Sequence, residues 1–258
     1  MLPGEDGATI TQPARVFELL KPWVSPEDVE LERTALYTFH SAIAPCWRSG
    51  RLLIAGDSAH LTPPFLGQGM GAGMRDAGNL AWKLARVLRG QNDDTLLDTY
   101  QAERAPHVRE YIELAVRLGG LINTKAMEAV LSGAVIEGGE AARMSSIKPR
   151  LGPGLAAGWN GPAGQIAPQP RLADGTRLDD RAGYRFAALL RPDFAASLPG
   201  ETLERLADRD VVVVADEAPE QQAWLQAADA PAVLVRPDRY VLGAARSVLE
   251  LNTLAATI

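Results

Sequence analysis

The stretch at positions 52–85, LLIAGDSAHLTPPFLGQGMGAGMRDAGNLAWKLA, decides how this chain folds. It opens with aliphatic residues, and the short apolar run at 51–55 predicts a strand buried on both faces, as in a parallel α/β sheet. It closes with apolar residues at helical spacing, which predict an amphipathic helix that Gly90 ends: Leu80, Leu84, Val87 and Leu88.

The strand is followed by Gly56 and Asp57, which places a carboxylate at the carboxyl edge of the predicted sheet. Ligands of open α/β folds bind at this edge, so Asp57 can accept hydrogen bonds from ligand hydroxyls such as those of a ribityl chain. A role that is confined to capping the turn is the structural alternative.

Prolines and glycines fill the loop between the strand and the helix. Pro63 and Pro64 stiffen the backbone, and glycine then takes every second position from Gly67 to Gly73. The first N–H groups of a helix have no intrahelical partner and carry the positive end of its dipole, so they attract an anion or an electron-rich carbonyl. Since glycines let the backbone approach a planar ring and a reduced flavin carries negative charge near N1 and the C2 carbonyl, the loop predicts a flavin site.

Two other kinds of site fit the loop less well. The pattern GDSAH departs from a serine nucleophile elbow, since His60 stands where the elbow requires glycine, and Ser58 is therefore expected to be structural. His60 lies within the candidate loop and is a candidate for catalysis. His40, His60 and His107 are too dispersed to predict a metal site.

Composition excludes several classes of protein. The 258 residues carry a formal net charge of −6 without a basic run, so a nucleic acid is not an expected partner. A single cysteine, Cys46, excludes an intramolecular disulfide. No apolar run reaches the roughly 18 residues that a membrane span needs, and the expected location is the cytoplasm.

Weaker patterns organise the rest of the chain. A short helix is expected before Pro22, an extended strand over 29–44, a long helix from Asp93 or Asp94 that Pro106 kinks, and a helical stretch at 125–135. The Gly- and Pro-rich segment 152–170 indicates a domain boundary near residue 165. A small α/β module follows, with a hairpin turning at Pro237 and Asp238.

The segment GDSAHLTPPFLGQGMGAGMRDAGNLAWKLA, together with its flanks at 37–55 and 96–119, resembles the second FAD motif of the single-component (class A) flavoprotein aromatic hydroxylases. That family includes para-hydroxybenzoate hydroxylase, phenol hydroxylase and the 3-(3-hydroxyphenyl)propionate hydroxylase group. The resemblance implies that NADH or NADPH reduces FAD, that O2 then forms a flavin C4a-hydroperoxide, and that oxygen is transferred to a small phenolic acid.

The resemblance also implies roles for individual residues. Asp57 would bond the ribityl chain, and the prolines would line the flavin ring. The expected cofactor contacts are Gly56, Asp57, Pro63, Pro64, Gly67, Gln68, Gly69, Met70 and Gly71. Substrate contacts are expected from Tyr37, Phe39 and His40, although alternation places His40 on the opposite face from the two aromatic rings.

The expected fold is α/β in three parts: a remnant of a substrate-binding domain at 1–50, Rossmann-like FAD-binding elements with long helices at 51–164, and a thioredoxin-like domain without Cys-x-x-C at 165–258. The G-x-G-x-x-G turn that holds the ADP part of FAD in the family does not occur in this sequence. The chain is therefore expected to be the C-terminal half of such an enzyme, acting with its missing half or as a homo-oligomer. The alternative is a non-catalytic fragment or interaction module.

Overall fold

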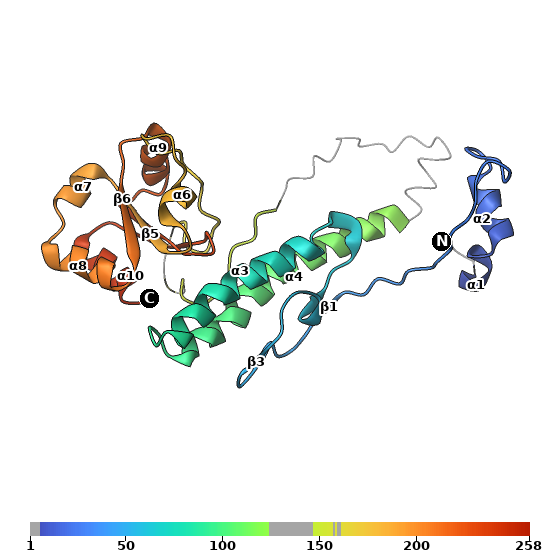
Figure 1. The fold of residues 1–258 in the computed structure, drawn as a ribbon, viewed down its shortest axis with the longest axis horizontal. Coiled ribbons are helices and arrows are strands. Elements are labelled where there is room, and N and C mark those ends of the chain that lie inside the picture. The colour runs from blue at the N-terminus through green and yellow to red at the C-terminus, as the bar shows by residue number, and fades with distance from the viewer. Residues whose placement is uncertain (1–5, 124–146, 157, 159–160) are drawn as a thin grey trace.

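Two long helices, α3 (Gly69–Leu88) and α4 (Asp98–Asn123), lie side by side in the middle of the computed structural model, which describes residues 6–123, 147–156, 158 and 161–258 (Figure 1). The short helix η3 (Asp94–Leu97) joins them. The expected end of α3 is confirmed, since Gly90 has a φ of 69° and the helix stops before it. The helical stretch expected at 125–135 falls outside the described residues.

The buried face of α3 is more polar than its apolar spacing predicts. Leu80 is buried as expected, whereas Leu88 is 84% exposed. Four polar or charged side chains are buried on this helix: Asp76, Asn79, Lys83 and Arg86. Such groups are stable in an interior only when they are paired, so their partners determine how the helix packs.

The N-terminal segment forms helices α1 (Gly7–Ile10) and α2 (Pro13–Leu20), and α2 ends before Pro22 as predicted. The strand expected over 29–44 is wrong for most of its length. Only β1 (Ala42–Ile43) is a strand, and it pairs antiparallel with β4 (His60–Leu61). Within the described residues the segment 29–41 has no partner strand, and extended backbone becomes a strand only when a neighbour completes its hydrogen-bond ladder.

The aliphatic run after the turn also differs from expectation. Its strand, β3 (Leu52–Leu53), pairs antiparallel with β2 (Arg48–Ser49) around Gly50, and Leu52 is 77% exposed. The prediction of a doubly buried parallel strand is therefore wrong for the described part of the chain. A parallel neighbour requires a crossover connection, and among the described residues none brings a strand to β3.

The C-terminal module is a four-stranded sheet in the order β6-β5-β7-β8, with helices on its faces. The strand β5 pairs parallel with β6, whereas β7 is antiparallel to both β5 and β8. The strands are β5 (Phe186–Leu190), β6 (Val211–Ala215), β7 (Ala232–Val235) and β8 (Val241–Ala245). The helices are α6 (Leu178–Ala182), α7 (Pro192–Ala196), α8 (Gly200–Asp208), α9 (Pro219–Ala227) and α10 (Val248–Ala255).

The hairpin predicted around Pro237 and Asp238 is confirmed by the pairing of β7 with β8. The end of the Gly- and Pro-rich segment 152–170, which we call the linker, is hydrogen-bonded to this hairpin. The Val241 N–H donates to the Gln165 carbonyl, and the Ala167 N–H donates to the Arg239 carbonyl. Helix α3 reaches the core of the module through Trp82, whose ring meets Phe186 edge-on at 5.2 Å between centroids. Apolar packing therefore holds the helical pair and the module together.

A buried charge cluster reinforces the same junction. Glu103 of α4 accepts hydrogen bonds from Lys83 (2.7 Å), Asn79 (2.9 Å) and both terminal nitrogens of Arg236 (2.8 Å each). Arg236 also donates to Asp238, at 2.7 and 3.0 Å. Burial disfavours the charge of Glu103, but the cations Arg236 and Lys83 outweigh it and hold the pKa of Glu103 below its usual range. The hairpin is thus fastened to α3 and α4 by paired ions.

Among the described residues, no helix is long and apolar enough to cross a membrane.

Candidate functional site

The turn after β3 presents an exposed carboxylate. Gly56 begins the short helix η1 (Gly56–Ser58) with a φ of 58°, a conformation that glycine adopts without strain. Its Cα lies against Gly73 of α3, where a Cβ on Gly73 would come within 3.4 Å of it. This close approach holds Asp57 beside the first turns of α3, where it is exposed and has no hydrogen-bond or ion-pair partner among the described residues.

The glycine-rich loop opens α3 without a side-chain cap. Gln68 occupies the N-cap position but makes no capping hydrogen bond, because its Oε1 accepts from Arg75 at 3.1 Å. The N–H groups of the first helical turn are therefore left for a ligand. A Cβ on Gly69 would meet no atom within 4 Å, so the space in front of these groups is open. An anion or a carbonyl at the edge of a planar ring fits this arrangement.

Asp76 holds the turn in place from inside the protein. Its side chain is fully buried, and its Oδ2 accepts from the Gly56 N–H at 3.1 Å and from His60 Nε2 at 2.6 Å. Arg104 of α4 donates to the other oxygen at 2.8 Å. Burial opposes the charge of Asp76, but the His60 hydrogen bond and the Arg104 charge together lower its pKa. The turn, α3 and α4 therefore meet at one ionised carboxylate.

Aromatic side chains of the extended segment gather beside the loop. Tyr37 and Phe39 stack at 6.4 Å between centroids, and Phe39 meets Phe65 of the helix η2 (Pro64–Leu66) edge-on at 6.4 Å. Phe65 packs so closely on Gly119 of α4 that a Cβ there would overlap its ring. Tyr37 and Phe39 remain 63% and 54% exposed, so a flat ligand could reach them.

A buried histidine lies between α4 and the C-terminal hairpin. His107 is 1% exposed, and its Nε2 lies 3.1 Å from the Tyr240 hydroxyl oxygen. Burial, assisted by the positive charges of Arg104 and Arg75, lowers the pKa of His107 to about 3. This imidazole is therefore neutral near neutral pH and packs against the hairpin.

The residues expected at the cofactor site have different surroundings. Pro63 is buried, whereas Pro64 and Met70 are exposed and Gly67 turns the chain with a φ of 61°. His40 is exposed and, among the described residues, is not in ring contact with Tyr37 or Phe39.

His60 and Ser58 of the turn do not form a catalytic pair. His60 is 2% exposed and engaged by Asp76, and it also packs on Trp47 at 5.5 Å between ring centroids. Ser58 is exposed and forms no hydrogen bond to a histidine among the described residues. This geometry lacks the serine–histidine contact that an activated serine nucleophile requires.

Sequence reasoning missed Asp76, Arg104 and Phe65. The signal for the first two was present, because charged residues share the face of α3 or α4 that also carries buried apolar side chains. Spacings of three and four residues place Asp76, Asn79 and Lys83 on one face of α3. A charged residue on such a face normally indicates that the face is exposed to solvent. Its burial can be predicted only when the residues that pair with it are known.

Within the described residues, no group of three or more His, Cys, Asp or Glu side chains is placed to hold a metal ion. The arrangement instead offers an exposed acceptor at Asp57, free backbone donors at the start of α3, and flanking aromatic rings. These groups bind a ligand that has hydroxyl groups, an electron-rich carbonyl edge and a flat ring. The chemistry of a reaction would have to come from that ligand.

Two family comparisons match separate parts of the chain. Residues 4–115 match the family described as FAD binding domain, and residues 190–257 match the family described as HcaD C-terminal domain. The first covers the turn, the glycine-rich loop and most of α4. The second covers most of the four-stranded module.

Named relatives are similar along most of this chain. A probable NADH-specific resorcinol 4-hydroxylase of Rhodococcus jostii is 38% identical over 95% of this chain and 49% of its own length. A 3-(3-hydroxy-phenyl)propionate/3-hydroxycinnamic acid hydroxylase of Mycolicibacterium smegmatis is 37% identical over 93% of this chain and 51% of its own length. The chain thus spans about half the length of the curated relatives that it matches.

A solved structure of aklavinone-11 hydroxylase with FAD and aklavinone superposes on 98% of this chain and 52% of its own, with a TM-score of 0.70 and 24% identity. At that identity the likeness concerns the fold alone.

Proposed function

Since this chain belongs to the family of FAD-dependent aromatic hydroxylases, we propose that it supplies part of the flavin site of a monooxygenase. The proposed enzyme uses NADH or NADPH and O2 to hydroxylate a small phenolic aromatic acid. The observation that carries the proposal is the uncapped, glycine-lined start of α3 beside the exposed Asp57.

Each group of the site has one role in this proposal. Asp57 accepts hydrogen bonds from the ribityl hydroxyls, and the backbone N–H groups from Gly69 to Gly71 face the pyrimidine edge of the flavin ring, whereas the Gly67 N–H already donates to the Pro64 carbonyl at 2.9 Å. Pro63 and Pro64 hold the loop at the ring. Bound FAD supplies the redox and oxygen chemistry, whereas this chain orients the ring and limits the access of water.

Asp76 and His60 act as positioning residues in the same proposal. Asp76 ties the Gly56 N–H to α3, and His60 completes the second contact to the same oxygen. Losing either contact would let the turn that carries Asp57 move. This role for His60 takes the place of direct catalysis, since its Nε2 is already engaged.

We place the phenolic substrate near Tyr37, Phe39 and Phe65. The stacked and edge-on rings form an exposed aromatic surface that adjoins the loop. The two relatives are named for resorcinol and for 3-(3-hydroxyphenyl)propionate, phenols with a second group at the meta position. A phenol of this class is the proposed substrate.

For the C-terminal part we propose a thioredoxin-like domain at 165–258 that packs rather than transfers electrons. Its sheet has one parallel and two antiparallel pairings in the order β6-β5-β7-β8, which supports this assignment. The one cysteine, Cys46, lies outside it, so it lacks a dithiol. The remaining proposed parts are a substrate-domain segment at 1–50 and FAD-binding elements at 51–164, in a cytoplasmic protein.

A flavin titration of the purified 258-residue chain tests the proposal. We expect saturable FAD binding near one equivalent, followed by flavin fluorescence and visible absorption. Asp57→Ala should weaken binding by about 1.5–3 kcal/mol, the loss of a charge-assisted hydrogen bond. The control is Asp208→Ala, which removes an exposed carboxylate from α8 and should leave FAD binding unchanged.

Two outcomes would oppose the proposal. An unchanged FAD dissociation constant in Asp57→Ala would remove the role given to Asp57. If the chain binds no FAD while circular dichroism shows it folded, the non-catalytic interaction module becomes the better description of this chain.

A further inference from the structure

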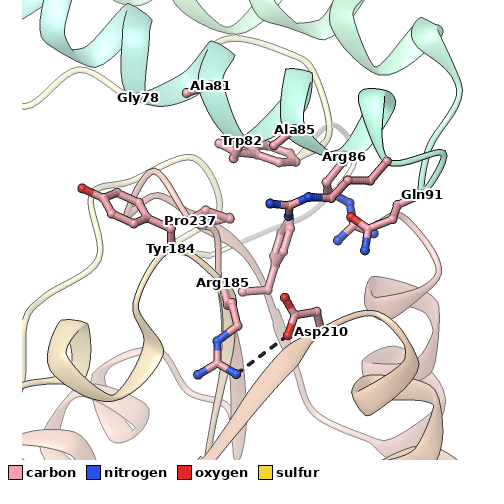
Figure 2. A pocket seen from close by; sticks show the side chains of 12 residues that line it. Gly78, Ala81, Trp82, Ala85, Arg86, Gln91, Tyr184, Arg185, Asp210 and Pro237 are labelled. Atoms are coloured by element: carbon pink, nitrogen blue, oxygen red, sulfur yellow. Dashed lines mark ion pairs between the residues drawn. The ribbon is translucent and has the colours of Figure 1, made fainter.

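A cleft lies between the second half of α3 and the start of β5, at the junction of the helical pair and the C-terminal module (Figure 2). We name it the interdomain cleft. Its volume is about 250 Å³, and its principal walls are Trp82, Arg86, Arg89, Tyr184, Arg185 and Phe186. None of these residues belongs to the glycine-rich loop.

Aromatic rings provide the apolar walls of the cleft. Trp82 and Phe186 are 7% and 2% exposed and meet edge-on, whereas Tyr184 at the mouth is 92% exposed. Small side chains on α3 leave room beside the indole, since Gly78 and Ala81 also line the cleft. The Trp82 Nε1 is buried and has no hydrogen-bond acceptor among the described residues. Arg236 lies over the Trp82 ring at 5.2 Å and Arg86 over the Phe186 ring at 5.6 Å, so the walls offer the edges of these two rings, the exposed Tyr184 and an unused donor.

The charged side chains of the cleft are predominantly basic. Arg86, Arg89 and Arg185 face a single carboxylate, Asp210, in a chain whose net charge is −6. Arg185 and Asp210 are 3.8 Å apart and both are about half exposed, so their pairing is loose. Arg185 also donates to the backbone carbonyls of Ala182 at 3.2 Å and Arg181 at 3.4 Å. Figure 2 shows Arg86 and Arg185 on opposite walls of the cleft.

Arg86 and Arg89 differ in how firmly they are held. Arg86 is fixed by Asn92 at 2.5 Å and lies over Phe186 at 5.6 Å. Arg89 is exposed and has no hydrogen-bond or ion-pair partner within the described part of the chain. An anion entering the cleft therefore meets at least one guanidinium that is free to bind it.

We infer that the interdomain cleft binds a single-ring aromatic carboxylate. The ring packs at the edges of Trp82 and Phe186 and beside the exposed Tyr184, and the carboxylate accepts hydrogen bonds from Arg89 and Arg185. The volume falls just below the roughly 300–1,000 Å³ of pockets for drug-sized ligands, which suits one ring rather than several.

The interdomain cleft is separate from the proposed flavin site, although one helix joins them. Gly78, the cleft residue nearest the start of α3, lies nine positions after Gly69, which corresponds to roughly 13 Å along the helix. A ligand in the cleft would contact both α3 and the C-terminal module, and so would stabilise the packing of one against the other. Binding there does not depend on FAD.

Calorimetric titration of the 258-residue chain with benzoate, in the absence of flavin, tests the inference. We expect saturable binding at one site. Phenol, which has the ring without the charge, and cyclohexanecarboxylate, which has the charge without the flat ring, should each bind at least about fivefold more weakly.

Substitutions locate the site. Arg89→Gln and Arg185→Gln should each weaken benzoate binding about tenfold, the effect of losing one charge-assisted hydrogen bond. Arg205→Gln on α8 removes an exposed arginine away from the cleft and should leave benzoate binding unchanged. None of the three should change FAD binding, which separates this inference from the proposed function.

Failure to bind benzoate, binding of phenol with equal affinity, or binding that is unaffected by both cleft substitutions would each overturn the inference.

Discussion

The buried histidine at the junction of α4 and the C-terminal hairpin should make this protein less stable at mildly acidic pH than at neutral pH. His107 has an ordinary pKa of 6.5 in the unfolded chain and one of about 3 in the folded protein. Burial is the main cause, and the charges of Arg104 and Arg75 add to it. Between these two values the unfolded chain binds a proton that the folded protein does not.

The sign and size of the effect follow from linkage. Because the folded pKa is lowered, the contribution of His107 is fully present above pH 6.5 and is lost as the pH falls toward 3. Protonation of the unfolded chain alone lowers the free energy of unfolding by about 2 kcal/mol between pH 7 and pH 5. That loss is a large share of the stability of an ordinary domain.

The assay is urea unfolding of the 258-residue chain at pH 7, 6 and 5, followed by circular dichroism. In His107→Gln the side-chain amide can still reach the Tyr240 hydroxyl but does not titrate, so its dependence on pH should be flatter by about 2 kcal/mol over this range. The same dependence in both proteins would refute the reasoning, since it would mean that His107 exchanges protons equally in both states.

Three further substitutions test the packing of the site and of the junction. Glu103→Gln leaves Lys83 and Arg236 without their shared anion, so it should lower the free energy of unfolding in urea by about 3 kcal/mol or more. The control is Glu110→Gln, on the exposed face of the same helix, which should change the free energy of unfolding little. Gly73→Ala brings a methyl group to 3.4 Å from the Gly56 Cα, so this contact offsets part of the gain in helix propensity, and the variant should weaken FAD binding. Gly69→Ala meets no atom and should stabilise the free chain more than Gly73→Ala does, while still obstructing the flavin; a greater stabilisation by Gly73→Ala would contradict this account. In Gly152→Ala the added methyl group would overlap the Ala102 carbonyl and the Pro106 ring, so the thermal midpoint should fall by an amount equivalent to about 2 kcal/mol. The control is Gly200→Ala, whose methyl group enters open space and should not lower the thermal midpoint.

Gly152 lies against the turn of α4 that contains Pro106. Pro106 lacks the N–H that would bond the Ala102 carbonyl, and the linker passes over that turn of the helix. The Gly152 N–H donates to the neighbouring Glu103 carbonyl at 2.8 Å. Only a residue without a side chain allows the backbone to come this close.

The sequence by itself determined the features that depend on neighbouring residues. Glycine at position 90 ends α3, Pro237 and Asp238 turn the C-terminal hairpin, and the glycine-rich loop opens a helix as its composition predicts. Each of these signals acts through local backbone geometry, so it can be interpreted without knowledge of the fold. The motif around the loop was also sufficient to indicate the FAD-dependent hydroxylase family.

Tertiary structure alone decided which groups hold the site together. The strand expected over 29–44 needed a partner that the described chain does not give it, and the charges of Asp76, Lys83 and Glu103 proved to be buried. Glu103 meets Arg236 across 133 positions of sequence. A charge is stable in the interior only beside a counter-ion, and the neighbouring residues in the sequence do not show which distant residue supplies that counter-ion.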